Sequence, residues 1–240
     1  MIGTTGLLYR FSTHLVYKSN VTPRVAKLME SAGPSVTLPP ISRVVWKGSR
    51  PDTGTKAIIM ELGRKFRARD IPPDQRRSVV VEMFGLLEKL HNDKGIVHGD
   101  IKETNFLWSR DGKLRLVDFS SARFITEEKS GWDESFSTEA YFTPIRGVQG
   151  GVPAPTVFDD YYALAVTLWA MYAARKPGRR QFNQKTIWRT DLAKVEDDMV
   201  RAWIKKVFKM AGCRLLWPDP MEERERERDR ERKGLGVGEM

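Results

Sequence analysis

Three side chains that can bind a divalent cation lie within a short stretch of the sequence. Asp100 precedes Asn105 by five positions, and Asp118 follows Asn105 by 13 positions at the end of an apolar run. A loop, a hairpin and a strand end would bring the two carboxylates and the carboxamide to one opening. Mg²⁺ takes hard oxygen ligands of this kind, combining one or two carboxylates with phosphate oxygens. The stretch therefore predicts phosphoryl transfer, which needs a metal clamp, a group that orients the attacking oxygen and a cation on the transferred group.

The same stretch resembles the catalytic and metal-binding loops of eukaryotic protein kinases, whose patterns are H-R-D-L-x-x-x-N and D-F-G. Here the patterns read His98-Gly-Asp-Ile-Lys-Glu-Thr-Asn105 and Asp118-Phe-Ser. The resemblance implies that Asp100 orients or deprotonates the substrate hydroxyl and that Lys102 neutralises charge on the γ-phosphate. It also implies that Asn105 and Asp118 hold Mg²⁺, and that His98 supports the loop from beneath.

Two later segments resemble the same family, in the expected order. The run Thr138-Glu-Ala-Tyr-Phe-Thr-Pro144 is similar to the end of an activation segment, in which the threonine bonds near the catalytic Asp and Lys. Asp160 opens a run similar to the family's central helix. The resemblance implies that the Asp160 carboxylate is a buried anchor that receives backbone N–H groups of the catalytic loop.

The nucleotide-binding part of the sequence is shorter than in the family. Only Gly3-Thr-Thr-Gly6 remains of the glycine loop, and it is either a truncated phosphate lid or an ordinary turn. Lys18 ends a predicted strand and resembles the lysine that pairs with the α- and β-phosphates. Its partner would be Glu30, the only acid between Lys18 and Asp52, unless Glu30 is a solvated residue and no ion pair exists. The last part of the nucleotide site is a hinge-like run in which Met60 takes the gatekeeper position. The nucleotide-binding residues that the resemblance implies are Gly3, Gly6, Lys18, Met60, Glu61 and Leu62.

Three positions depart from the family pattern. Gly99 stands where an arginine would meet a phosphorylated activation loop, which favours a protein that is not switched on through that contact. Ser120 replaces the metal-loop glycine and predicts a costly positive φ without removing the metal ligand. Ile145 replaces a glutamate, so a stabilising ion pair with the C-terminal half is lost.

The composition predicts a folded chain with one large domain or two packed lobes. The 240 residues are 40% hydrophobic and 30% charged, which excludes wholesale disorder. One cysteine excludes both a disulfide scaffold and a cysteine-rich zinc site. No stretch approaches about 20 consecutive apolar residues, and the first residues lack a signal-peptide pattern. We therefore expect no transmembrane segment and an intracellular location, cytoplasmic or nuclear.

The net charge of +10 and the pI of about 9.7 predict attraction to polyanions, among them nucleotide phosphates. The Lys and Arg residues are spread along the chain, which favours a solvated basic surface over a nucleic-acid site. Nucleic-acid binding is therefore not predicted.

Apolar periodicity and turn residues predict the main elements. Residues 120–157 read as a loop, and the last helix is predicted to bury Val195, Met199, Trp203, Val207 and Ala211. The expected helices are 22–32, 74–91, 160–174 and 195–211, and the expected strands are 14–18, 57–60, 96–97 and 114–117.

The resemblance implies an α+β, bilobal protein kinase-like fold with a small, shortened β-rich N-lobe and a mainly α-helical C-lobe. The kinase-like domain is expected over residues 1–217, with the N-lobe at about 1–60, the hinge at about 60–64 and the C-lobe at about 65–217. Residues 218–240 are a charged, low-complexity tail without an apolar face, which predicts disorder.

The function expected from the resemblance is an ATP- and Mg²⁺-dependent protein kinase that acts on Ser/Thr hydroxyls, with an unidentified protein substrate. Lys102, two residues after Asp100, favours Ser/Thr over Tyr. Two alternatives stay open. His-Gly-Asp also resembles aminoglycoside and choline kinases, which are small-molecule phosphotransferases. The short nucleotide lobe would also suit a pseudokinase, a binding module without turnover.

Overall fold

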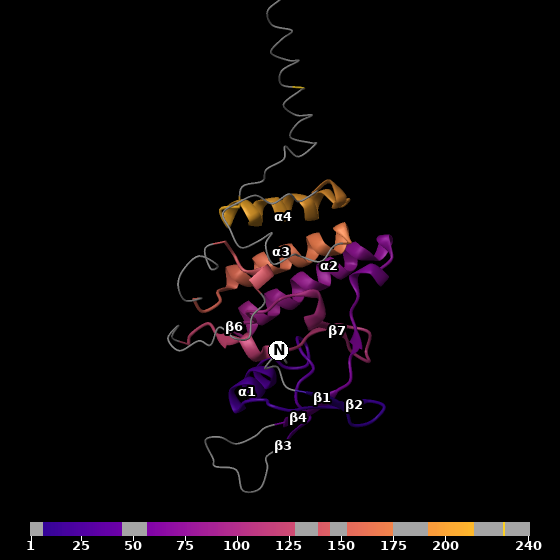
Figure 1. The fold of residues 1–240 in the computed structure, drawn as a ribbon, viewed down its shortest axis with the longest axis vertical. Coiled ribbons are helices and arrows are strands. Elements are labelled where there is room, and N and C mark those ends of the chain that lie inside the picture. Colours follow the sequence, from indigo (N-terminus) through magenta and orange to yellow (C-terminus); the bar gives the residue numbers. More distant parts are fainter. Residues whose placement is uncertain are drawn as a thin grey trace, which may run out of the picture.

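The computed structural model describes residues 7–44, 57–127, 139–144, 153–174 and 192–213, together with the single residue Arg228. Figure 1 shows strands β1 to β4 and helix α1 at one end, with α2, α3 and α4 stacked in succession toward the other end. The predictions made for Gly3, Gly6, Thr138, Ile145 and the tail 218–240, apart from Arg228, lie outside the described residues.

The first sheet is antiparallel with the strand order β1-β2-β4-β3. Its strands are β1 (Leu8–Arg10), β2 (Leu15–Lys18), β3 (Ser42–Val44) and β4 (Ala57–Glu61). Val16 pairs with Met60 in the β2–β4 register. Since alternate side chains of a strand share one face, Val16, Lys18 and Met60 lie on the same face of this sheet.

Helix α1 (Pro23–Ala32) begins and ends as its sequence predicts. The Thr22 hydroxyl accepts the N–H of Val25 at 3.2 Å, and Pro23 occupies the first helical position. Gly33 ends the helix at φ 71°, a left-handed conformation that glycine adopts cheaply. The buried face of α1 is Val25, Ala26, Leu28, Met29 and Ala32, which belong to the hydrophobic core.

A second sheet carries the stretch that predicted chemistry. Its strands are β5 (Arg64–Lys65), β7 (Phe106–Trp108) and β8 (Leu114–Leu116), in the order β5-β7-β8. The β7–β8 hairpin starts directly after Asn105 and ends two residues before Asp118. The Val117 N–H donates to the Asn105 carbonyl at 2.9 Å and closes the hairpin. The hairpin therefore brings Asn105 and Asp118 to the same end of the sheet. A separate pair, β6 (Ile96–Val97) and β9 (Arg123–Phe124), flanks the catalytic loop sequence.

Three helices form the α-rich part: α2 (Pro73–Glu88), α3 (Val157–Ala173) and α4 (Asp198–Met210). Helix α3 is buried over most of its surface and packs against α2 and α4. It starts earlier than predicted because Thr156 and Asp159 form a reciprocal capping box. Helix α2 continues into a π-helical turn, Lys89–Asp93, that the apolar periodicity did not reveal. No helix among the described residues is long and apolar enough to cross a membrane.

The face predicted for the last helix is wrong at one position. Met199 is 67% exposed, whereas α4 buries Val200, Ile204, Val207 and Phe208. The helix begins three residues later than predicted because the Asp197 carboxylate caps it, accepting the N–H groups of Met199 and Val200. The predicted loop 120–157 also contains β9 and a 3₁₀ turn at Glu139–Tyr141.

Candidate active site

The Asp160 carboxylate holds the start of the catalytic loop from below. It is 1% exposed, and it accepts the backbone N–H groups of His98 at 2.7 Å and Gly99 at 2.8 Å. This is the contact that the resemblance implied for Asp160. A third partner of the carboxylate is the His91 Nε2 atom, at 2.9 Å. The π-helical turn carries this imidazole toward α3.

His98 links the catalytic loop to the metal-binding loop. Its side chain is fully buried, and its ring lies 5.0 Å from the Phe119 ring. His98 Nε2 lies 3.0 Å from the Val117 carbonyl, which can only accept, so this nitrogen carries the proton. Nδ1 then accepts the Asp100 N–H at 3.3 Å. The buried imidazole thus orients the backbone at Asp100.

Gly99 has a structural reason to be glycine. Its φ is +78°, and a Cβ atom would lie 2.5 Å from the Ser121 carbonyl oxygen and 2.8 Å from Pro155 Cγ. The arginine that the family carries here would therefore collide with the backbone that follows the metal-binding loop.

We expect Gly99→Ala to lower the free energy of unfolding by about 2–3 kcal/mol, since it adds atomic overlap to a left-handed backbone. The matched control is Gly212→Ala, at φ +74° with no atom within 4 Å of the new Cβ. The control should lower the free energy of unfolding by only about 1 kcal/mol, because it adds the left-handed backbone strain without atomic overlap. Equal losses in urea denaturation of the two variants would contradict the close approach seen at Gly99.

Asp100 lies in a network with the other polar residues of its loop. It is 3% exposed, and Lys102 Nζ donates to Asp100 Oδ2 at 2.6 Å. Asn105 Nδ2 donates to the Asp100 carbonyl at 2.7 Å and to Oδ2 at 3.0 Å. Both Asn105 partners are acceptors, which fixes the orientation of the amide and leaves its oxygen to face a ligand.

Asp118 ends the hairpin strand in a left-handed conformation, at φ 66°. Its Oδ1 accepts from Lys18 Nζ at 2.8 Å and from the Ser120 hydroxyl at 3.1 Å. The strain expected at Ser120 is absent, because Ser120 lies in a 3₁₀ turn and Asp118 takes the positive φ. Non-glycine residues in this region cluster at functional sites.

Burial alone would raise the pKa of Asp118, but the adjacent Lys18 charge and the hydrogen bonds from Lys18 and Ser120 outweigh it. The pKa of Asp118 is therefore lowered from its ordinary value of 3.8. A carboxyl with a lowered pKa stabilises the fold above its unfolded pKa, and the stabilisation is lost as the pH falls through the folded pKa.

In Lys18→Met, without nucleotide or metal, we expect the pKa of Asp118 to rise above its ordinary value, because burial remains while the attraction is gone. The stability deficit of the variant should grow as the pH rises from acid toward neutral, and vanish in acid. A ¹³C NMR titration of the aspartate carboxyls would measure the shift, with the exposed Lys206→Met as control. An unshifted Asp118 in Lys18→Met would show that the ion pair does not govern its pKa.

Of the two alternatives left open for Glu30, the structure supports the solvated residue and not the partner of Lys18. Glu30 lies on the exposed face of α1 and forms a two-pronged ion pair with Arg43 of β3 instead. Within the described ranges, Lys18 pairs only with Asp118. The lysine that was expected to contact the phosphates therefore forms an ion pair with Asp118, the predicted metal ligand.

A cavity of about 410 Å³ lies between the two sheets, within the range of about 300–1,000 Å³ typical of ligand sites. Its lining includes Lys18, Asn105 and Asp118, together with Met60, Glu61 and Leu62 of the hinge-like run. The sequence had grouped only Asn105 and Asp118 with Asp100. Sequence reasoning missed Leu8, Val16, Met29, Gly63, Lys65, Thr104, Leu107 and Val117. Alternation with Lys18 along β2 could have indicated Val16, whereas Met29 lies on helix α1 and carries no such signal.

The described part of the activation-segment-like run includes the short turn Glu139–Tyr141, whereas Thr138, the residue to which the resemblance gave a contact, lies outside the described residues. Burial, with smaller contributions from the Glu103 and Asp100 charges, raises the pKa of Tyr141 to about 12. The Thr143 hydroxyl donates to Asp159 Oδ1 at 3.0 Å and ties this segment to the start of α3.

Comparison with known proteins identifies the family. Residues 53–214, more than half of the chain, match the family model for the protein kinase domain. The chain therefore belongs to the protein kinase family, and it has the bilobal α+β fold of that family.

Several curated relatives carry serine/threonine kinase names. A "probable serine/threonine-protein kinase" of Corynebacterium efficiens is 25% identical over 189 residues, covering 74% of this chain and 28% of that protein. Serine/threonine-protein kinase F of Synechocystis is 36% identical over 94 residues, covering 38% of this chain and 18% of that protein. The chain thus spans less than a third of the length of either relative.

Among solved structures, the chain is similar to the kinase PK-1 of Cydia pomonella granulovirus. The TM-score is 0.54 at 18% sequence identity, and the match covers 70% of this chain and 64% of that one. A likeness at this identity supports the fold alone.

Proposed function

We propose that the chain is an ATP- and Mg²⁺-dependent protein kinase that transfers the γ-phosphate of ATP to Ser or Thr hydroxyls. The observation that carries the proposal is the convergence of Lys18, Asn105 and Asp118 on one cavity beside Asp100. Lys18 and Asp118 are 100 residues apart in the sequence, yet they touch. The serine/threonine kinase names of the relatives support the class of acceptor.

The side chains present fit Mg²⁺ and a nucleotide. Asp118 offers a carboxylate, and the Asn105 amide oxygen is free to accept because its nitrogen donates to Asp100. These two oxygens, completed by phosphate oxygens, form the ligand set that Mg²⁺ prefers. Val16 and Met60 contribute apolar wall to the cavity, which suits the flat face of an adenine base.

The loop residues divide the work of the transfer. Asp100 would take the proton of the substrate hydroxyl as the hydroxyl oxygen bonds to phosphorus and the bond to the ADP oxygen breaks. Asn105 holds the Asp100 side chain by its amide, and Lys102 places a positive charge 2.6 Å from Asp100, where the transferred group must pass. Mg·ATP, when bound, supplies the phosphoryl group and a metal ion that neutralises phosphate charge.

We also propose that the kinase domain is residues 1–217, with residues 60–64 as the hinge, and that residues 218–240 form a separate charged tail. The β-rich elements before Glu61 and the helices after Arg64 support the division at the hinge. The family match, which ends at residue 214, supports the outer boundary.

The test is transfer of label from [γ-³²P]ATP to a degenerate peptide library that contains Ser and Thr, with Mg²⁺ and the full chain. We expect acid-stable phosphoserine or phosphothreonine, and no label on a library with Ala in their place. Label on choline or an aminoglycoside instead would make the chain a small-molecule phosphotransferase. Nucleotide binding without any label transfer would make it a pseudokinase.

A further inference from the structure

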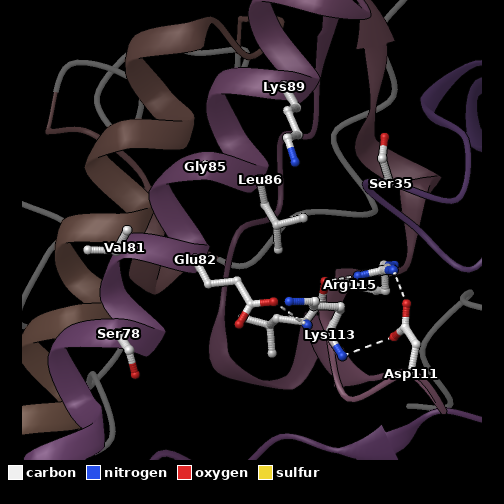
Figure 2. Close-up of a pocket in the computed structure, with 11 residues that line it drawn as sticks. Ser35, Ser78, Val81, Glu82, Gly85, Leu86, Lys89, Asp111, Lys113 and Arg115 are labelled. Atoms are coloured by element: carbon white, nitrogen blue, oxygen red, sulfur yellow. Dashed lines mark hydrogen bonds and ion pairs between the residues drawn. The ribbon is translucent and has the colours of Figure 1, made fainter.

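A surface groove of about 560 Å³ lies beside α2 and shares no lining residue with the nucleotide cavity. Helix α2, the loop that follows α1 and the β7–β8 turn form its walls (Figure 2). Leu86 and Leu114, both under 5% exposed, form the apolar floor, and Val81 is 65% exposed at its side. Gly85 adds no side chain, so the helix wall is hollowed between Val81 and Leu86.

Both carboxylates that line the groove are already engaged. The Ser109 hydroxyl and the Lys113 backbone N–H donate to Asp111, and Arg115 pairs with it at 2.7 Å. These hydrogen bonds, the one from Ser109 foremost, lower the pKa of Asp111, so it stays ionised and bound within its own turn. Glu82 accepts the Leu114 N–H at 2.7 Å. Figure 2 shows the contacts of Asp111 with Lys113 and Arg115 at one end of the groove.

The cations of the groove are in excess. Lys89, Lys113 and Arg115 face two carboxylates, and neither lysine ammonium forms an ion pair within the part of the chain that the structure describes. In Figure 2 the Lys89 side chain extends from the end of α2 toward the groove. The groove therefore offers an apolar floor next to two unpaired positive charges.

From this arrangement we propose that the groove binds an acidic peptide segment of a partner protein, with an aliphatic side chain over Leu86 and flanking carboxylates at Lys89 and Lys113. The groove is open along exposed residues, which suits an extended segment better than an enclosed small molecule. Among the described residues, no aromatic side chain lines the groove, so this part of the chain offers no stacking surface of the kind that single-stranded nucleic acids use.

The binding test uses a fluorescein-labelled peptide of sequence Glu-Leu-Glu-Asp-Leu-Glu-Glu and the full chain, followed by fluorescence anisotropy in EDTA without nucleotide. This readout needs neither ATP nor turnover, so its failure leaves the proposed kinase function untouched. We expect saturable binding that weakens several-fold between low and physiological salt, because exposed charges are screened. A peptide with lysines in place of the acids should not bind.

The decisive variants place a side chain in the groove or reverse the charge of one of its lysines. A Cβ atom at Gly85 would meet nothing within 4 Å, and Glu is a better helix former than Gly, so Gly85→Glu should fold normally. Gly85→Glu should lower the affinity for the peptide about five- to tenfold, and Lys89→Glu and Lys113→Glu should each do the same. Gly85→Ala should bind within about twofold of the wild type, since it adds only a methyl group.

The matched charge control is Lys206→Glu, on the exposed side of α4. It should leave the affinity unchanged. Equal weakening by Lys206→Glu would show general attraction to a basic chain and overturn the proposal. Unchanged peptide affinity in a folded Gly85→Glu variant would also overturn the proposal. A third contradicting result would be a dT oligonucleotide that binds more tightly than the peptide and whose affinity the same groove variants lower.

Discussion

Asp100→Asn is expected to lower the turnover number about 10³-fold while leaving the fold intact, because positioned general bases contribute about 10²–10⁴-fold. Asn has the shape of Asp and keeps one oxygen for the donors at Lys102 and Asn105. It cannot take a proton from a substrate hydroxyl at neutral pH. The measurement is the initial rate of peptide phosphorylation at saturating Mg·ATP, with the melting temperature recorded alongside.

Asp198→Asn is the matched control for this substitution. Its side chain is 78% exposed and pairs only locally with Arg201, so the rate should stay that of the wild type. The affinity for ATP should also change little in Asp100→Asn, because Asp100 does not line the cavity in which we propose that ATP binds. A variant that keeps more than about a tenth of the wild-type rate would contradict the role given to Asp100 as general base.

Asp160→Asn should cause the largest loss of stability, about 3 kcal/mol or more, because it leaves buried donors without an acceptor. The carboxylate serves three donors with two oxygens: Oδ1 accepts from Gly99, and Oδ2 accepts from His98 and His91. An amide has one acceptor oxygen, so in either orientation its NH₂ group faces at least one of these donors.

For a chain of this size the loss corresponds to a fall in melting temperature of about 6–12 °C, at about 2–4 °C per kcal/mol. The peptide-phosphorylation rate should fall too, since His98 and Gly99 begin the catalytic loop. Asp198→Asn again serves as the control, with an expected change within about 0.5 kcal/mol for an exposed site. A melting temperature of Asp160→Asn that matches this control would show that Asp160 is not the anchor of the loop.

The grouping of Asp100, Asn105 and Asp118 could be predicted from the sequence because local structure determines it. The Asp111-Gly112 turn forces a hairpin, and the hairpin register alone returns Asp118 to Asn105. The partner of Lys18 could not be predicted in this way. Proximity in sequence favoured Glu30, but α1 buries the residues around it and turns Glu30 to solvent, where Arg43 reaches it.

Helix ends followed from capping chemistry where the cap was recognised. Thr22, Pro23 and Gly33 set the ends of α1 close to the predicted range 22–32, whereas the Asp197 cap was missed and the predicted face of α4 was wrong at Met199. The contact of His91 with Asp160 depends on a π-helical turn, which shifts the side-chain direction after α2. A periodicity of 3.6 residues cannot reveal such a turn.

The central claim is that Lys18, Asn105 and Asp118 form a working Mg·ATP site, and its most direct test is ligand-dependent thermal stability. Wild type and Asp118→Asn are each melted alone, with ATP and Mg²⁺, and with ATP and EDTA. ATP at a hundredfold excess over its Kd raises the free energy of unfolding by about 2.7 kcal/mol. For this chain that is a rise of about 5–10 °C in the melting temperature. We predict this rise for the wild type with Mg²⁺ only, and its loss in Asp118→Asn. No rise at millimolar Mg·ATP, or an equal rise in Asp118→Asn, would contradict the claim.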